Sequence, residues 1–122
     1  MERTTVAIGA RAEARAVRIL LERGYEIVER NVRCAAGELD IVARDRDRTI
    51  LVFVEVRSRA DDEHGSGAET VAWRKQRQIA RVAGHYLIER DPAYEEIRFD
   101  VVSITGDEIE LIQDAFRLGD LR

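Results

Sequence analysis

The chain has 122 residues, 45% of them hydrophobic and 36% charged, a composition typical of a single globular domain over residues 1–122. No apolar run approaches the roughly 18 residues that a membrane span needs, and the N-terminus lacks a signal-peptide pattern. The single cysteine, Cys34, excludes an internal disulfide and suits a reducing compartment, so we expect a cytoplasmic protein without a membrane partner. The net charge of −4 is weak evidence against a non-specific DNA binder, whose surface is usually basic.

Helical and strand patterns alternate along the chain. A helix is predicted over residues 5–23, where an apolar stripe ends before Gly24; the stripe comprises Ile8, Ala14, Val17, Leu20 and Leu21. Three strands follow at 25–31, 38–43 and 49–56, separated by a loop at 33–37 and a polar turn at 44–48. After a loop at 58–67, a second helix is predicted over 69–90, and strands at 97–105 and 108–113 are joined at Gly106-Asp107. A strand, a long helix and another strand imply one parallel pair, so we expect an α/β or α+β fold with a mixed sheet in two or three layers.

The segment 49–56 is the strongest strand signal, and it carries a carboxylate. Both of its faces are apolar around Phe53, which indicates a central strand covered on both sides. Glu55 stands between Val54 and Val56, where an ionised carboxylate is costly unless a cation or hydrogen bonds compensate it.

A two-residue turn at Asp47-Arg48 would set the register between this strand and the preceding one. That register pairs Asp40 with Glu55 and Glu38 with Arg57, and it aligns an aliphatic face that contains Leu39, Ile41, Ala43, Val52, Val54 and Val56. Two facing carboxylates repel unless positive charge lies between them. Two interpretations are open: a structural ion network neutralised by Arg57 or another basic group, or a Mg²⁺ or Mn²⁺ site with waters left for a substrate phosphate.

These two strands also carry a family resemblance. Gly37-Glu38-Leu39-Asp40-Ile41-Val42 and Val52-Phe53-Val54-Glu55-Val56-Arg57-Ser58-Arg59 resemble the YraN-like family of small bacterial proteins. The resemblance extends over nearly the whole chain, through Gly9, Glu13, Ala16, Gly24-Tyr25, Asn31, Arg33, Lys75, Arg98-Phe99-Asp100-Val101-Val102 and Ala115-Phe116. The family is similar to the PD-(D/E)XK nuclease superfamily, and within it to the archaeal Holliday-junction resolvases. This implies a restriction-endonuclease-like αβββαβ core, a Mg²⁺ or Mn²⁺ cofactor and DNA as the partner.

The resemblance implies roles for individual residues. Asp40 and Glu55 match the metal-binding carboxylates, the backbone carbonyl of Val56 would complete the metal sphere, and Glu13 matches a helix-borne glutamate of the resolvases. Arg57 stands where the superfamily has a catalytic lysine. An arginine stays charged, so it can orient a water or stabilise phosphate charge but cannot take a proton. Leu39 replaces a motif proline that is not a ligand.

Basic residues on the second helix and beside the motif strands are candidates for binding nucleic acid. Arg74, Arg77 and Arg81 share a helix face that is either merely solvated or tracks phosphates, opposite an apolar face of Ala72, Ile79, Val82, Ala83, Tyr86 and Leu87. Lys75 lies at the edge of the apolar stripe, so it either snorkels to solvent or reaches the hairpin and restores the ammonium that Arg57 lacks. Arg33 and Arg59 flank the motif strands, and Asp100 is expected to be buried and hydrogen-bonded.

Two hypotheses follow from these residues and the resemblance. The first is a Mg²⁺- or Mn²⁺-dependent endonuclease acting on DNA, including branched DNA. The alternative is a catalytically inactive protein of nuclease fold that binds nucleic acid or a protein partner, favoured by Arg57 and the acidic net charge. Resolvases of this type work as two-fold dimers, so the resemblance leaves a homodimer open.

Overall fold

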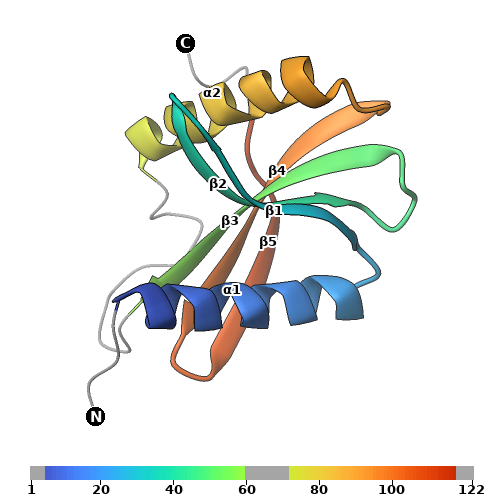
Figure 1. Cartoon of the computed structure of the whole chain (residues 1–122). Coiled ribbons are helices and arrows are strands. Elements are labelled where there is room, and N and C mark those ends of the chain that lie inside the picture. Colours follow the sequence, from blue (N-terminus) through green and yellow to red (C-terminus); the bar gives the residue numbers. More distant parts are fainter. Residues whose placement is uncertain (1–4, 60–71, 118–122) are drawn as a thin grey trace.

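The computed structural model describes residues 5–59 and 72–117 (Figure 1). Their elements follow the order α1 (Thr5–Glu22), β1 (Glu26–Cys34), β2 (Gly37–Arg44), β3 (Ile50–Arg59), α2 (Trp73–Arg90), β4 (Glu96–Thr105) and β5 (Glu108–Phe116). This is an α/β fold that contains the αβββαβ series implied by the resemblance, followed by one further strand.

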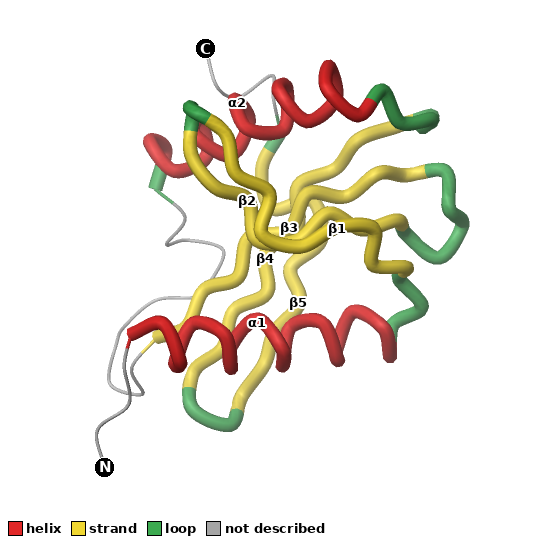
Figure 2. The backbone as a smooth tube through the Cα atoms, in the orientation of Figure 1, coloured by secondary structure: helices red, strands yellow, loops and turns green. Residues whose placement is uncertain are grey.

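The five strands form one mixed sheet between two helices. The strand order is β1-β2-β3-β4-β5, with every neighbouring pair antiparallel except β3 and β4. That parallel pair confirms the predicted crossover, which runs through α2. The helices lie on opposite faces of the sheet, so the arrangement has three layers (Figures 1 and 2). The N-terminal ends of both helices lie on the same side of the molecule, on the left in Figure 1.

Two hydrophobic clusters fill the spaces between the layers. On the side of α2, the rings of Phe53, Tyr86, Phe99 and Phe116 pack with centroids 4.8 to 5.8 Å apart from one ring to the next. On the side of α1, the aliphatic side chains include Leu20, Ile41, Ala43, Val52 and Val54. Residues 51–54 of β3 have no exposed surface, which confirms that this strand is central and covered on both faces.

The buried face of α1 differs from the predicted stripe. Ala12, Ala16 and Leu20 face the sheet at a spacing of four residues, whereas Leu21 is 55% exposed and Ala14 is exposed. Because alanines occur on every side of this helix, the sequence does not determine which side faces the sheet. In the structure, the buried side is the one that places small residues, Ala12 and Ala16, against the sheet.

The end of α1 is as predicted. Gly24 has φ 89°, in the left-handed region that glycine tolerates best, and its N–H donates to the carbonyl of Leu21. The N–H of Tyr25 donates to the carbonyl of Leu20, which completes a Schellman motif. In α2, Ile79, Val82, Ala83 and Tyr86 are buried as predicted, but Ala72 is an exposed N-cap residue. The predicted start of this helix at residues 69–71 lies outside the described residues.

The predicted register between β2 and β3 is correct, although the predicted turn is wrong. Arg48 donates its N–H to the carbonyl of Asp45, and Asp45 donates its own to the carbonyl of Ile50. A β-turn at 45–48 therefore begins a four-residue connection, 46–49, in place of the predicted two-residue connection, 47–48. The connection is longer by one residue at each end, so the pairing is unchanged: Ile41 lies opposite Val54 and Ala43 opposite Val52.

The ladder between β2 and β3 is short. Within the described strands it runs from Arg44–Leu51 to Ile41–Val54 and stops there, so the predicted Glu38–Arg57 pair does not form. Leu39 instead pairs with Val32 of β1 and joins the hydrophobic cluster under α2, not the α1-side cluster as predicted. The β1–β2 hairpin therefore leaves β3 near Asp40, and its tip lies beside α2 (Figure 2).

Candidate active site

Asp40 occupies the position where β2 separates from β3. Because Asp45 donates to Ile50, hydrogen-bonded pairs alternate along the ladder, and its next step would bring the N–H of Val56 to the carbonyl of Leu39. The side chain of Asp40 takes that place: its Oδ2 accepts the Val56 N–H at 2.8 Å. The Asp40 carboxylate is thereby fixed against β3 at the point where the sheet opens.

Glu55 lies next to Asp40 and is almost completely buried, with 8% of its surface exposed. Burial, together with the charge of Asp40 and a hydrogen bond to Asp40, raises the pKa of Glu55 to about 8. The two side chains are therefore in hydrogen-bond contact, and they do not point to opposite faces of the sheet. The ladder ends one step before a direct Asp40–Glu55 backbone pair, but the side chains meet as the register predicts.

Lys75 brings a positive charge from α2 to this carboxylate pair. Its Nζ lies 3.5 Å from Oε2 of Glu55, and it lowers the pKa of Glu55 against the effects of burial and Asp40. The lysine thus reaches the hairpin, one of the two alternatives for a residue at the edge of the apolar stripe. Its side chain is 41% exposed, so the ammonium is accessible to solvent and to a ligand.

A cavity of about 650 Å³ opens beside Asp40, between α1 and the β1–β2 hairpin. Its lining includes Gly9 and Glu13 of α1, and Asn31 and Arg33 of β1. Glu13 accepts a hydrogen bond from Arg30 Nε at 2.9 Å, which neutralises its buried charge. Arg30 was missed from the sequence, although strand pairing with Ile41 places it on the α1 side of the sheet.

Three predicted arginines lie on β1 or β3: Arg33, Arg57 and Arg59. Arg33 pairs with Glu38 at 3.6 Å, and its side chain is 74% exposed at the cavity. Arg57 is half-buried and pairs through its backbone with Ser103 of β4. Arg59 is the last residue of β3, and its side chain lies outside the described part of the structure, so its predicted role stays a prediction. Among the described residues, no group of three or more His, Cys, Asp or Glu side chains is placed to hold a metal ion.

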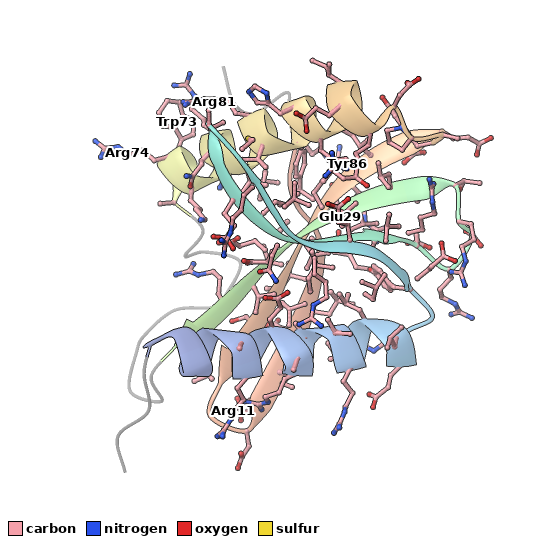
Figure 3. The ribbon with its side chains drawn as sticks, viewed as in Figure 1. Arg11, Glu29, Trp73, Arg74, Arg81 and Tyr86 are labelled. Atoms are coloured by element: carbon pink, nitrogen blue, oxygen red, sulfur yellow. The ribbon has the colours of Figure 1, made fainter. Side chains whose placement is uncertain are left out.

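The N-terminal half of α2 carries an exposed aromatic residue among the predicted arginines. Trp73 is 49% exposed, and the guanidinium of Arg77 lies 4.7 Å from its ring centroid. Figure 3 shows the side chains of Trp73, Arg74 and Arg81 together at this end of the helix. Trp73 was also missed from the sequence. It is the single tryptophan of the chain, and its position directly before two basic residues was the available signal.

Asp100 is fully buried and hydrogen-bonded as predicted, but it belongs to a separate cluster. It accepts hydrogen bonds from Arg98 and from the hydroxyl of Tyr25, each at 2.8 Å, and from the N–H of Asp114 at 2.9 Å. Burial raises the pKa of Tyr25 to about 12. These contacts join the end of α1 to β4 and β5, so their role is structural.

Neither the helices nor the solved structures that match this chain indicate a function. No helix within residues 5–59 and 72–117 is long and apolar enough to cross a membrane. Among solved structures, SfsA of Pyrococcus furiosus in complex with Ca²⁺ matches with a TM-score of 0.28 and 15% identity, over 85% of this chain and 62% of that one. A TM-score this low supports no inference about fold or function.

Sequence relatives are much closer. A UPF0102 protein of Methylibium petroleiphilum is 49% identical over 93% of this chain and 96% of its own length. A UPF0102 protein of Lachnoclostridium phytofermentans is 45% identical over 88% of this chain and 91% of its own length. The sequence profile described as "Uncharacterised protein family UPF0102" matches residues 12–104, which include Glu13, Asp40, Glu55 and Lys75. The chain therefore belongs to this family, as the resemblance to the YraN-like proteins predicted.

Proposed function

We propose that this protein hydrolyses phosphodiester bonds in DNA with Mg²⁺ or Mn²⁺ bound at Asp40 and Glu55. The observation that carries the proposal is the contact between buried Glu55, whose pKa is raised to about 8, and half-buried Asp40, which lines an open cavity. Strongly perturbed carboxylates at a cavity are typical of catalytic and metal-binding sites.

A purely structural ion network accounts poorly for Glu55. In such a network, a paired carboxylate has its pKa lowered, because the partner charge favours the ionised form. Arg98 has this effect on Asp45, whose pKa is lowered although burial opposes the shift. At Glu55, burial and Asp40 outweigh Lys75, so the ionised carboxylate destabilises the fold. A cation bound to Glu55 would account for a carboxylate that otherwise lowers the stability of the fold.

The donor set fits a hard divalent cation. Mg²⁺ is commonly held by one or two carboxylates and keeps several waters for substrate phosphate. Asp40 is oriented by the Val56 N–H through Oδ2, and Glu55 lies against it, so both oxygen donors are held in place before a cation arrives. When bound, the metal would lower the pKa of a water and neutralise phosphate charge.

Other side chains bind and orient the substrate. Lys75, 3.5 Å from Glu55 and partly exposed, can donate hydrogen bonds to a water or phosphate oxygen at the carboxylates. Arg33 lies at the cavity and is suited to a phosphate of the DNA backbone. Glu13 is held by Arg30, so it shapes the cavity wall through that ion pair.

The rival is a protein of the same fold that binds nucleic acid without cleaving it. It is favoured by Arg57 at the lysine position and by the lack, among the described residues, of a group of three metal-ligating side chains. The two functions separate in a cleavage assay, because binding alone produces no product.

The first prediction concerns cleavage of a four-way DNA junction and a linear duplex in Mg²⁺ or Mn²⁺. Asp40→Asn and Glu55→Gln should each lower the rate at least about a hundredfold, since changes around metal ligands typically cost 10- to 100-fold and these remove a ligand charge. Glu110→Gln, an exposed carboxylate on β5, is the matched control and should cleave normally. Activity that survives both active-site substitutions would refute the proposal. Retained DNA binding without cleavage by the wild type would establish the rival.

A further inference from the structure

The N-terminal half of α2 presents an aromatic side chain to solvent where burial would be expected. Tryptophan is usually well buried because of its large apolar surface, yet Trp73 is 49% exposed. An exposed aromatic residue of this size marks a surface that contacts a ligand or partner more often than a scattered aliphatic residue does.

The surroundings of Trp73 are suited to a polyanion with flat, apolar faces. Residues 73–81 include Arg74, Lys75, Arg77 and Arg81 and no acidic residue, although the whole chain has a net charge of −4. The guanidinium of Arg77 over the Trp73 ring, 4.7 Å from its centroid, enlarges the stacking surface with a second planar group. Aromatic rings among basic side chains are the combination that binds single-stranded nucleic acid.

A groove along this surface includes Lys75, the residue that forms an ion pair with Glu55 of the candidate active site. It has a volume of about 630 Å³ and lies between α2, from Trp73 to Arg81, and Ala36 at the tip of the β1–β2 hairpin. Lys75 lines the groove, and its Nζ lies 3.5 Å from Glu55. A strand lying in the groove would therefore contact Lys75, whose ammonium also contacts Glu55.

We propose that this groove binds an unpaired strand of DNA adjoining the cleaved bond, with one base stacked on Trp73. This inference rests on the proposed nuclease function and names its substrate class: DNA with a single-stranded segment next to the scissile phosphate. The bases of a duplex have their faces covered by neighbouring base pairs, so an exposed indole can stack only on an unpaired base or a strand end. The arginines of α2 then bind the phosphates of the same strand.

The experiment uses the tryptophan itself, without divalent cations, so that binding is measured apart from cleavage. Because Trp73 is the single tryptophan, its fluorescence reports this location alone. We expect short oligo(dT) to quench the emission, and a blunt duplex of equal length to quench it weakly, because only its two terminal base pairs present an uncovered face.

Variants assign the effect to stacking. In fluorescence anisotropy with labelled oligo(dT), Trp73→Ala should weaken binding about tenfold, as expected for the loss of one stacked base. Trp73→Phe should retain most of the affinity because the phenyl ring still stacks. Tyr94→Ala removes an aromatic side chain of similar exposure, 46%, outside the groove, and should bind as the wild type does.

Each outcome bears on this proposal separately from the nuclease assay. Quenching by oligo(dT) and a specific loss in Trp73→Ala support it even if the protein cleaves nothing, in which case the nuclease proposal alone fails. Equal quenching by blunt duplex, tighter binding of oligo(U) than of oligo(dT), or unchanged affinity in Trp73→Ala would overturn it. Self-association of the protein that Trp73→Ala abolishes, without an effect on DNA binding, would assign the surface to a second copy of the chain and also overturn it.

Discussion

At the scale of single residues, Asp40 and Glu55 differ in their relation to the fold although both belong to the candidate site. Asp40 accepts the Val56 N–H and so replaces a hydrogen bond of the sheet. Glu55 is buried among apolar neighbours, and its raised pKa means that the folded protein holds a proton there more tightly than the unfolded chain does. The first residue therefore stabilises the local structure, and the second makes its stability depend on pH.

The pH dependence has a definite sign. The pKa of Glu55 rises from 4.5 in the unfolded chain to about 8 in the fold, so its protonated form contributes stability that is fully present below about pH 4.5 and lost as the pH rises through about 8. Glu55→Gln cannot ionise. In EDTA, its melting temperature should therefore increase relative to the wild type as the pH goes from about 5 to about 9. Scanning calorimetry across this range measures the difference, and a constant offset would contradict the assignment. Glu110→Gln should follow the wild type throughout.

At the scale of elements, the sequence predicted pairing better than it predicted turns and helix phase. The β2–β3 register follows from apolar alternation, since shifting it by one residue would put Glu55 among the aliphatic residues of the face that contains Ile41, Ala43, Val52 and Val54. The turn could not be predicted because a two-residue and a four-residue connection give the same register. The buried face of α1 was predicted wrongly because alanine is compatible with both the solvent-exposed and the buried side of a helix.

The separation of β2 from β3 near Asp40 also lies beyond sequence patterns. Leu39 is apolar and suits either face, and its place under α2 depends on how far the β1–β2 hairpin turns toward that helix. The approach of Lys75 to Glu55 depends on the same packing. The sequence therefore left two alternatives for Lys75, an ammonium directed to solvent and one directed to the hairpin. The carboxylates, in contrast, were identified from strand alternation because a charge inside an apolar strand is conspicuous.

Gly37 is the element-scale position where a small change should alter the hairpin. Its φ of 144° is unfavourable for other residues, and an added Cβ would overlap the side chain of Gln78 on α2. Gly37→Ala should destabilise the fold by about 1–3 kcal/mol in urea unfolding. The same substitution at Gly84, where a Cβ meets no atom within 4 Å, should stabilise α2 by roughly 0.5–1 kcal/mol. Equal effects at the two glycines would show that the hairpin does not depend on this contact.

At the scale of the whole molecule, the chain is acidic, yet the groove of α2 is lined by four basic residues, Arg74, Lys75, Arg77 and Arg81. The groove of α2 contains Lys75, which contacts Glu55, and the cavity beside α1 contains Asp40. The helices cover opposite faces of the sheet, and their N-terminal ends lie at the same end of the molecule (Figure 1). Only the three-dimensional arrangement joins them, since the residues involved extend from Gly9 to Arg81. The sequence supplied the candidates, and the packing of two helices on a twisted sheet supplied their proximity.

Metal binding should be visible in the stability of the intact protein. A cation that binds only the folded state stabilises it by about 2.7 kcal/mol at a hundredfold excess over its dissociation constant, which corresponds to several degrees in melting temperature. Mn²⁺ should produce this shift at about pH 8 in the wild type, and Asp40→Asn or Glu55→Gln should abolish it. Ca²⁺ and K⁺ provide comparisons for ion size and charge. An equal Mn²⁺ shift in all three proteins would place the metal elsewhere.

The hydrogen bond from Val56 to Asp40 has a consequence for the descent of such proteins. A lineage that abandoned chemistry would still benefit from an acceptor at position 40, because the opened sheet leaves the Val56 N–H in need of one. Position 55 has no such constraint, and an apolar replacement there would relieve a buried charge. Under the proposed hydrolysis, a carboxylate at position 55 is therefore the better marker of activity among proteins of this fold, and its replacement would mark a relative without the reaction.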